Sequence, residues 1–163
     1  MREKIGIIPG SFDPITKGHL DIITRASGLF DKVIVSVLNN RTKNPLFSAE
    51  ERVKLIEKTV ESLDNVEVDQ FDGLLIDYVR QKNAKAIIKG LRAVSDFEYE
   101  LQMASINQKL DDQVETIFMM TSPEYAYLSS SIVKELAKYH AQTHDLVPDC
   151  VEDALNRKFS KEL

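Results

Sequence analysis

The sequence lacks several features that would place it outside the cell or in a membrane. It has one cysteine, Cys150, so no disulfide can form within the chain, and we expect a reducing compartment, by default the cytoplasm. No apolar run approaches the roughly 18–20 residues of a membrane helix. Gly6, Pro9 and Gly10 interrupt the apolar start, so we expect no secretion signal and no membrane partner.

An excess of basic residues is also missing. The formal net charge of −5 argues against a broad nucleic-acid-binding face, because phosphate backbones attract proteins with a basic excess. A small basic pocket remains compatible with this charge. With 163 residues, of which 43% are hydrophobic, the chain suits a single domain over residues 1–163.

Short apolar runs rich in Val, Ile or Phe are present, each about as long as a buried strand. They are Ile5–Pro9, Val33–Leu38, Val66–Phe71, Ala86–Lys89 and Thr116–Met120. Helical patterns separate them, and a last amphipathic helix is predicted at about 148–160. This alternation predicts an α/β fold with a doubly wound, parallel, five-stranded sheet of the Rossmann-like type, because helical crossovers join parallel neighbours.

Two of the predicted helices carry a start signal. Ser48 with Glu51, and Ser95 with Glu98, have the Ser-x-x-Glu spacing of a capping box. The helical patterns themselves cover Leu20–Phe30 and Ser48–Leu63. In this fold class ligands bind beyond the carboxyl ends of the strands, so we expect function in the loops that follow the strands.

The loop after the first predicted strand, Pro9–His19, has the features of an anion site. Gly18 and His19 open a helix, and the free amides and positive dipole end of a helix start favour phosphate. Gly-x-Gly-x-x-Gly and P-loop motifs are absent, so hydride transfer and P-loop hydrolysis lose their usual support. Taken alone, His19 is more often a residue that caps or packs the helix.

Three later loops offer similar chemistry. Lys89 and Arg92 flank Gly90 before a predicted helix, which suits a phosphate, although such clusters are often structural. Lys43 lies in a polar loop, where a lysine is usually a solvated charge. The consecutive serines 129–131 precede a helix and are ordinarily caps, but they offer more hydroxyls than capping needs.

The motifs of these loops resemble those of a known family. PGSFDPITKGH, ending in Thr16-Lys17-Gly18-His19, is similar to the first motif of the nucleotidyltransferase superfamily. KGLRAVSDFEYE from Lys89, and the three serines followed by Val133-Lys134-Glu135, resemble motifs of the phosphopantetheine adenylyltransferase family. The resemblance runs from Ile5 to about His140. Lys89 departs from it, since many members carry Arg there, and lysine keeps the charge but loses the planar fork.

The resemblance implies a function and a set of site residues. The reaction would transfer AMP from ATP to 4′-phosphopantetheine, giving dephospho-coenzyme A and pyrophosphate in coenzyme A biosynthesis. The implied catalytic residues are His19, Lys43 and Arg92, and the implied acceptor-binding residues are Ser11, Lys43, Leu75 and Lys89. The implied ATP-binding residues are Ser11, Phe12, His19, Gly90, Leu91, Arg92, Glu100, Tyr125, Ala126, Tyr127, Leu128, Ser129, Ser130 and Ser131.

The resemblance also implies partners. We expect Mg²⁺ to arrive with ATP rather than in a protein-built metal site, because no suitable carboxylate cluster is visible. A homohexamer and feedback binding of coenzyme A are implied as well. Plainer interpretations stay open for Leu75, which suits core packing, and for Glu100, which suits an exposed helix carboxylate.

Two alternative functions stay open at this point. One is another small nucleotidyltransferase, for example nicotinamide mononucleotide adenylyltransferase, which shares the first motif but should lack the Gly-Leu-Arg and Asp-Phe-Glu-Tyr-Glu block. The other is a non-catalytic nucleotide-binding module, which would usually have lost a catalytic side chain. His19, Lys43, Arg92 and the serines are all present here.

Overall fold

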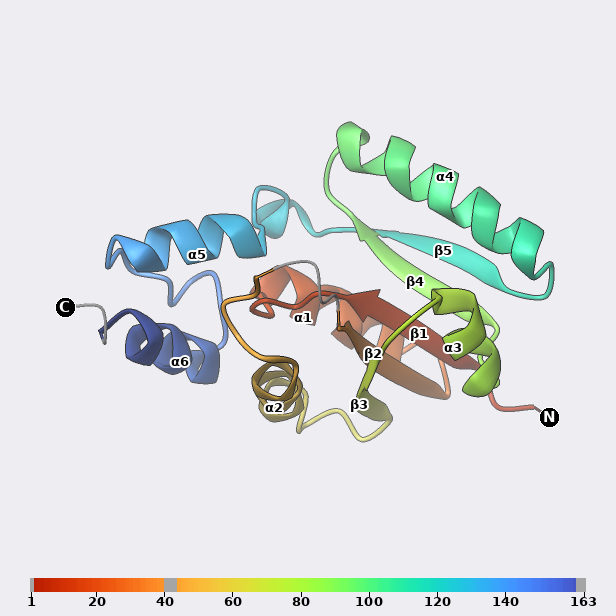
Figure 1. Ribbon diagram of the computed structural model, residues 1–163, viewed down its shortest axis with the longest axis horizontal. Coiled ribbons are helices and arrows are strands. Elements are labelled where there is room, and N and C mark those ends of the chain that lie inside the picture. Colours follow the sequence, from red (N-terminus) through yellow and green to blue (C-terminus); the bar gives the residue numbers. More distant parts are fainter. Residues whose placement is uncertain (1, 40–43, 161–163) are drawn as a thin grey trace.

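The computed structural model describes residues 2–39 and 44–160 of the chain. A five-stranded parallel sheet with the strand order β3-β2-β1-β4-β5 forms its centre (Figure 1). The strands are β1 (Ile5–Gly10), β2 (Lys32–Leu38), β3 (Val66–Phe71), β4 (Ala86–Leu91) and β5 (Glu115–Met120). The helices are α1 (Lys17–Ser27), α2 (Ala49–Thr59), α3 (Leu75–Gln81), α4 (Val94–Leu110), the 3₁₀ turn η1 (Pro123–Tyr125), α5 (Ser130–Lys138) and α6 (Asp149–Ser160).

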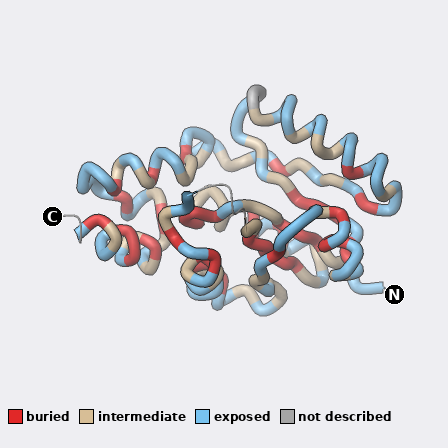
Figure 2. The backbone as a smooth tube through the Cα atoms, in the orientation of Figure 1, coloured by how far each residue is buried: buried red, intermediate tan, exposed pale blue. Residues whose placement is uncertain are grey.

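The core lies on both faces of the sheet, as the predicted doubly wound fold requires. Because successive strand residues point to opposite faces, Ile8 packs in the cluster that α1, α2 and α6 cover, whereas Ile7 packs in the cluster that α3 covers. Helix α4 lies on the second face, where the ring of Phe97 meets that of Phe118 on β5 edge to face, with the ring centroids 5.7 Å apart. Buried residues follow the strands and the inner sides of these helices (Figure 2). The predicted fold class is confirmed.

Helix starts test the local predictions. At α2 the Ser48 side chain accepts from the Glu51 amide and the Glu51 side chain accepts from the Ser48 amide, so this capping box is confirmed. At α4 the predicted start at Ser95 is wrong, because Ala93 is the N-cap, without a side-chain bond. Helix α1 begins at Lys17, earlier than the apolar pattern indicated, because Thr16 provides the cap.

The carboxyl ends of β1 and β4 face the part of the molecule where α5 and α6 pack together (Figure 1). The order of the strands places β1 and β4 side by side although they are far apart in sequence. The crevice between their following loops is where a doubly wound fold binds ligands. No helix within residues 2–39 and 44–160 is long and apolar enough to span a bilayer.

Candidate functional site

A cavity of about 520 Å³ lies at this crevice, and we call it the main cavity. Its walls come from the ends of β1 and β4, the first loop, the start of α1 and the segment before α5. Most of the predicted site residues line it. They are Ser11, Phe12, His19, Lys89, Gly90, Arg92, Glu100, Tyr125, Leu128, Ser129, Ser130 and Ser131.

His19 is both a capping residue and a cavity residue. It is the third residue of α1, and its Nδ1 accepts a hydrogen bond from the backbone N–H of Thr16 at 2.9 Å. Its own backbone N–H donates to Oγ1 of Thr16 at 3.3 Å. The box thus uses histidine where glutamate or glutamine is usual. Since Nδ1 is an acceptor, a neutral ring carries its proton on Nε2, which is then available as a donor.

The environment keeps this ring neutral. Burial, and secondarily the positive charge of Arg92, lower the pKa of His19 from 6.5 to about 4. Both effects disfavour the imidazolium form. At neutral pH, His19 therefore presents one Nε2–H donor to the main cavity and cannot take a proton at Nδ1 without losing its cap.

Phe12 supports the imidazole from the first loop. Its ring meets that of His19 edge to face, with centroids 5.0 Å apart, and the residue is buried. Its φ of 48° lies in the left-handed region, which aromatic residues seldom adopt and which tends to occur at functional sites. A Cβ on Gly10 would lie 3.0 Å from the Phe12 ring. Because glycine has no Cβ, position 10 leaves room for the Phe12 ring beside His19.

The positive side of the cavity is built from the end of β4, which carries Lys89, and the following loop, which carries Arg92. Nη1 of Arg92 donates to the carbonyl of Leu128 at 2.8 Å, and its Nε pairs with Asp96 at 3.4 Å. The hydrogen bond to Leu128 connects the loop after β4 to the segment before α5. Nζ of Lys89 lies 3.5 Å from the carboxylate of Glu100, and both groups are partly exposed. Glu100 is thus the ion-pair partner of Lys89 at the cavity wall.

The three serines have different local roles. Ser129 is the N-cap of α5, with its Oγ accepting from the Ile132 amide at 3.2 Å. Oγ of Ser130 donates to the carbonyl of Pro14 at 2.8 Å. Ser131 is exposed, and its hydroxyl makes no hydrogen bond to the part of the chain that the structure describes. The plain capping interpretation therefore holds for Ser129, and Ser131 is the serine whose hydroxyl remains available.

Some predicted site residues lie elsewhere. Leu91, Ala126 and Tyr127 do not line the main cavity. Leu75 begins α3 and packs, partly buried, against the core cluster on the second face of the sheet, as its plainer interpretation predicted. Lys43 lies outside the residues that the structure describes.

Sequence reasoning also missed residues of the cavity wall. Ile22 and Thr121 line it, and a Cβ on Gly90 would lie 3.1 Å from Cγ1 of Ile22. Gly90 therefore allows β4 to approach α1 closely, a reason different from the backbone approach to phosphate that we predicted. Ile22 could have been found, since it lies three residues after His19 on one helix face. Thr121 directly follows β5, at the carboxyl edge of the sheet.

The described residues offer few side chains that could together bind a metal ion. Within residues 2–39 and 44–160, His, Cys, Asp and Glu do not form a group of three or more that could hold an ion. Asp13, a buried carboxylate of the first loop, already accepts from the Leu46 and Phe47 amides and pairs with Lys134.

Comparisons with known proteins agree with this arrangement. The Cytidylyltransferase-like family matches residues 7–136. A crystal structure from Vibrio parahaemolyticus, described provisionally as a nicotinate-nucleotide adenylyltransferase, superimposes with a TM-score of 0.73. It covers 99% of this chain and 98% of that one at 16% identity, which is a likeness of fold.

Closer relatives narrow the family. The phosphopantetheine adenylyltransferase of Alkaliphilus metalliredigens is 61% identical over 155 residues, which are 95% of this chain and 99% of that protein. The phosphopantetheine adenylyltransferase of Caldanaerobacter subterraneus is 58% identical over 158 residues, with 97% and 99% covered. At this identity over nearly the whole length, the chain belongs to the phosphopantetheine adenylyltransferase family.

Proposed function

We propose that this protein transfers the adenylyl group of ATP to the phosphate of 4′-phosphopantetheine, giving dephospho-coenzyme A and pyrophosphate. The observation that carries the proposal is the position of His19, whose Nδ1 accepts from the Thr16 amide and which lines one cavity together with Lys89 and Arg92. Family membership supports the choice of substrates.

The reaction suits a site of donors and cations. An oxygen of the acceptor phosphate forms a bond to the α-phosphorus of ATP, the bond from that phosphorus to the bridging oxygen breaks, and its electron pair leaves with pyrophosphate. The acceptor needs no strong base, because the second pKa of a phosphate monoester is about 6. What the site must supply is alignment and neutralisation of the charge that builds on the α-phosphate.

Each predicted residue has a proposed task. Nε2–H of His19 donates to the α-phosphate oxygens, and Arg92 neutralises charge on ATP. Ser11 and Lys89 serve the acceptor side, with Lys43 as a further proposed ligand of the acceptor phosphate and Leu75 beside the pantetheine arm. The remaining residues proposed to hold ATP are Phe12, Gly90, Leu91, Glu100, Tyr125, Ala126, Tyr127, Leu128, Ser129, Ser130 and Ser131.

Mg²⁺ enters this proposal as part of the nucleotide substrate. ATP phosphates and water are its preferred ligands when a protein offers few oxygen donors. Arg92 and the free amides at the starts of α1 and α5 then hold the phosphates that carry the ion.

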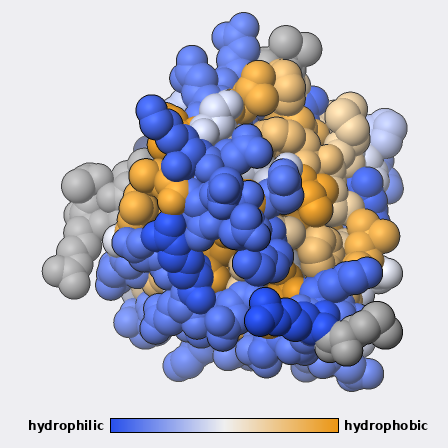
Figure 3. All heavy atoms as spheres, turned by 90° about the vertical axis from the view of Figure 1, so that its right-hand side faces the viewer, coloured by the Kyte–Doolittle hydropathy of each residue, from blue (hydrophilic) through white to orange (hydrophobic). Residues whose placement is uncertain are grey.

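We further propose a homohexamer in the cytoplasm that also binds coenzyme A as a feedback ligand. Exposed apolar side chains of α4 and β5 support association. They are Phe97, Tyr99, Leu101, Ile106, Leu110, Ile117 and Met120. Figure 3 shows the side of the molecule that lies at the right in Figure 1. On this side, apolar residues gather in one part of the surface and hydrophilic residues cover the rest. Patches of this kind commonly mark protein interfaces.

A product assay tests the function. Incubation with ATP, Mg²⁺ and 4′-phosphopantetheine should yield dephospho-coenzyme A by mass spectrometry, together with pyrophosphate. A parallel reaction with nicotinamide mononucleotide should yield no dinucleotide. Preferential use of nicotinamide mononucleotide would identify another small nucleotidyltransferase. ATP binding without pyrophosphate from either acceptor would instead indicate a non-catalytic module.

A further inference from the structure

A second cavity of about 210 Å³ adjoins the main cavity, and we call it the side cavity. The two share Ser11, Ser130 and Ser131 as walls. The side cavity also reaches Arg52 on α2 and Lys134 on α5, two cations that are not among the predicted site residues. Ser11, Ser130 and Ser131 therefore lie at the boundary of the two cavities.

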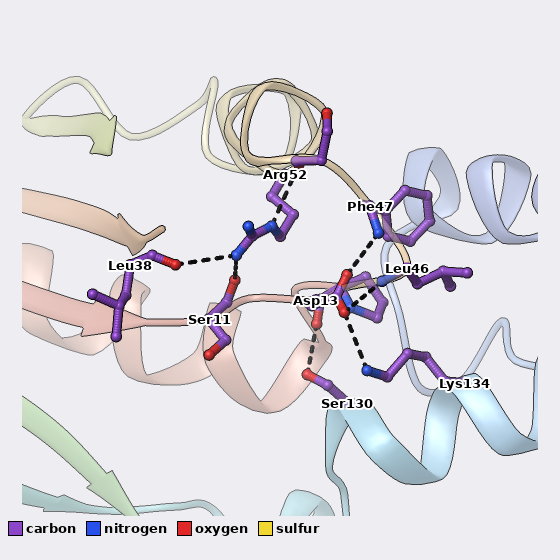
Figure 4. A network of polar contacts seen from close by, with 10 residues as sticks. Ser11, Asp13, Leu38, Leu46, Phe47, Arg52, Ser130 and Lys134 are labelled. Carbon is purple, nitrogen blue, oxygen red and sulfur yellow. Dashed lines mark hydrogen bonds and ion pairs between the residues drawn. The ribbon is translucent and has the colours of Figure 1, made fainter. Parts of the chain in front are cut away.

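Arg52 is the buried cation of this region, with only 4% of its surface exposed. Its Nη1 donates to the carbonyl of Ser11 at 2.7 Å and to that of Leu38 at 3.3 Å, and its Nε donates to the carbonyl of Ser48 at 3.3 Å (Figure 4). One guanidinium thus joins the first loop, the end of β2 and the start of α2. These segments meet at the carboxyl edge of the sheet.

The remaining nitrogen of Arg52, Nη2, makes no hydrogen bond to the described residues. In the described residues, every fully buried side-chain nitrogen or oxygen of a non-exposed residue has a hydrogen-bond partner. Nη2 of Arg52 has none there, so this nitrogen is not fully enclosed. Because Arg52 lines the side cavity, its Nη2 donors are accessible from that cavity.

The charges around the side cavity do not cancel. The buried carboxylate of Asp13 is paired with Nζ of Lys134 at 3.1 Å and also accepts from the amides of Leu46 and Phe47 (Figure 4). Arg52 has only carbonyl partners in the part of the chain described, and no carboxylate. A buried cation without a counter-ion is costly, and an anionic ligand compensates it.

We propose that Arg52 is a positioning residue for the acceptor substrate, which rests on the function proposed above. It holds the Ser11 backbone at the boundary of the two cavities and gives the side cavity a positive charge that suits a phosphate monoester. ATP meets its own proposed cation, Arg92, in the main cavity. Arg52 therefore affects the acceptor much more than the nucleotide.

The test compares Arg52→Gln and Arg52→Lys with Lys54→Gln. Lys54 is an exposed cation on the same helix and does not line either cavity, so it is the matched control for loss of one charge. Arg52→Gln should raise the KM for 4′-phosphopantetheine by about 10–100-fold, the effect of a lost charge-assisted hydrogen bond. The ATP dissociation constant, measured by calorimetry without acceptor, should stay within about twofold of wild type.

Arg52→Lys should raise the same KM less, because lysine keeps the charge but not the planar fork. An acceptor KM within about twofold of wild type in Arg52→Gln would overturn the proposal, as would an equal loss of ATP affinity. If Arg52→Gln does not fold, the same comparison is made on Arg52→Lys. A wild-type protein that makes no dephospho-coenzyme A would overturn the proposed function itself, before any variant is measured.

Discussion

The imidazole of His19 has two nitrogens with different tasks. Nδ1 accepts from the Thr16 amide and completes the start of α1, and this leaves Nε2–H as the donor toward the main cavity. The plain interpretation of a capping histidine is therefore confirmed, and the proposed catalytic role uses the other nitrogen of the same side chain. The cap also fixes the ring orientation, so the donor does not have to be ordered when substrate binds.

Removal of the Nε2–H donor should slow the reaction. His19→Ala is expected to lower turnover by on the order of 10²–10³-fold while leaving ATP binding largely intact, because the donor acts on charge that develops in the transition state. Single-turnover kinetics and ATP calorimetry measure the two effects. His144→Ala, an exposed histidine outside the main cavity, is the control and should keep wild-type turnover. Wild-type turnover in His19→Ala would remove His19 from the mechanism.

The lowered pKa of His19 predicts how stability depends on pH. Its pKa is about 4 in the folded protein and about 6.5 unfolded, so the unfolded chain binds a proton first as pH falls. The contribution of His19 to stability is therefore complete above pH ~6.5 and declines as pH falls toward ~4. The free energy of unfolding, measured with urea, should fall less between pH 7 and pH 5 in His19→Gln than in wild type.

The imidazole resonances provide a direct check of the same pKa. The His19 signal, identified by its absence in His19→Gln, should titrate near pH 4 rather than near 6.5. A midpoint at or above 6.5 would mean that the ring is charged in the acidic part of the physiological range, contrary to the neutral donor proposed here.

Close packing between α1 and β4 supports the main cavity at the level of secondary structure. Gly90 lies on β4 against Ile22 of α1, and Ile22 also lines the main cavity. Both helix starts at the cavity, those of α1 and α5, have side-chain caps. Their capped first turns keep the remaining free amides directed at the site.

A methyl group at position 90 should disturb this packing. Gly90→Ala places a Cβ 3.1 Å from the buried Ile22, so we expect a loss of about 1–3 kcal/mol in the free energy of unfolding and weaker ATP binding. Gly28→Ala is the matched control, because its Cβ would meet only the Arg25 carbonyl at 3.5 Å and its φ of −79° suits alanine. Urea titration compares the two, and equal small effects would contradict the packing argument.

Exposed apolar side chains gather on helix α4 and strand β5. Helix α4 and the edge strand β5 carry seven of the exposed apolar residues named above, and Leu101 and Ile106 on α4 are 46% and 52% exposed. A helix that is apolar on its outer face is usually covered by another chain. This is the physical support for the proposed homohexamer.

A charge on this surface should weaken the assembly. Ile106→Lys is expected to lower the molar mass found by light scattering below that of six chains, because a lysine in an apolar interface must be desolvated. Leu29→Lys, at an exposed apolar position outside α4 and β5, should leave the mass unchanged. A wild-type monomer at micromolar concentration would contradict the homohexamer itself.

Local patterns in the sequence were sufficient to predict the architecture of the sheet and its helices. The apolar runs predicted the strands to within about two residues, and the alternation with helices predicted the parallel sheet, because strands and helices respond mainly to neighbouring residues. The motifs around His19, Lys89 to Glu100 and the three serines indicated the family and most of the cavity wall. The start of α4 was missed because a Ser-x-x-Glu spacing also occurs inside a first turn.

Contacts between distant segments had to come from the folded chain. Ser11 meets Arg52 across 41 positions, and Asp13 meets Lys134 across 121, because the crossovers bring these segments to the same edge of the sheet. The sequence alone contained the imidazole, the cations and the glycines. Their burial, their partners and the choice of the His19 nitrogen that completes the cap depend on what surrounds them in three dimensions, since desolvation and hydrogen bonding act through space.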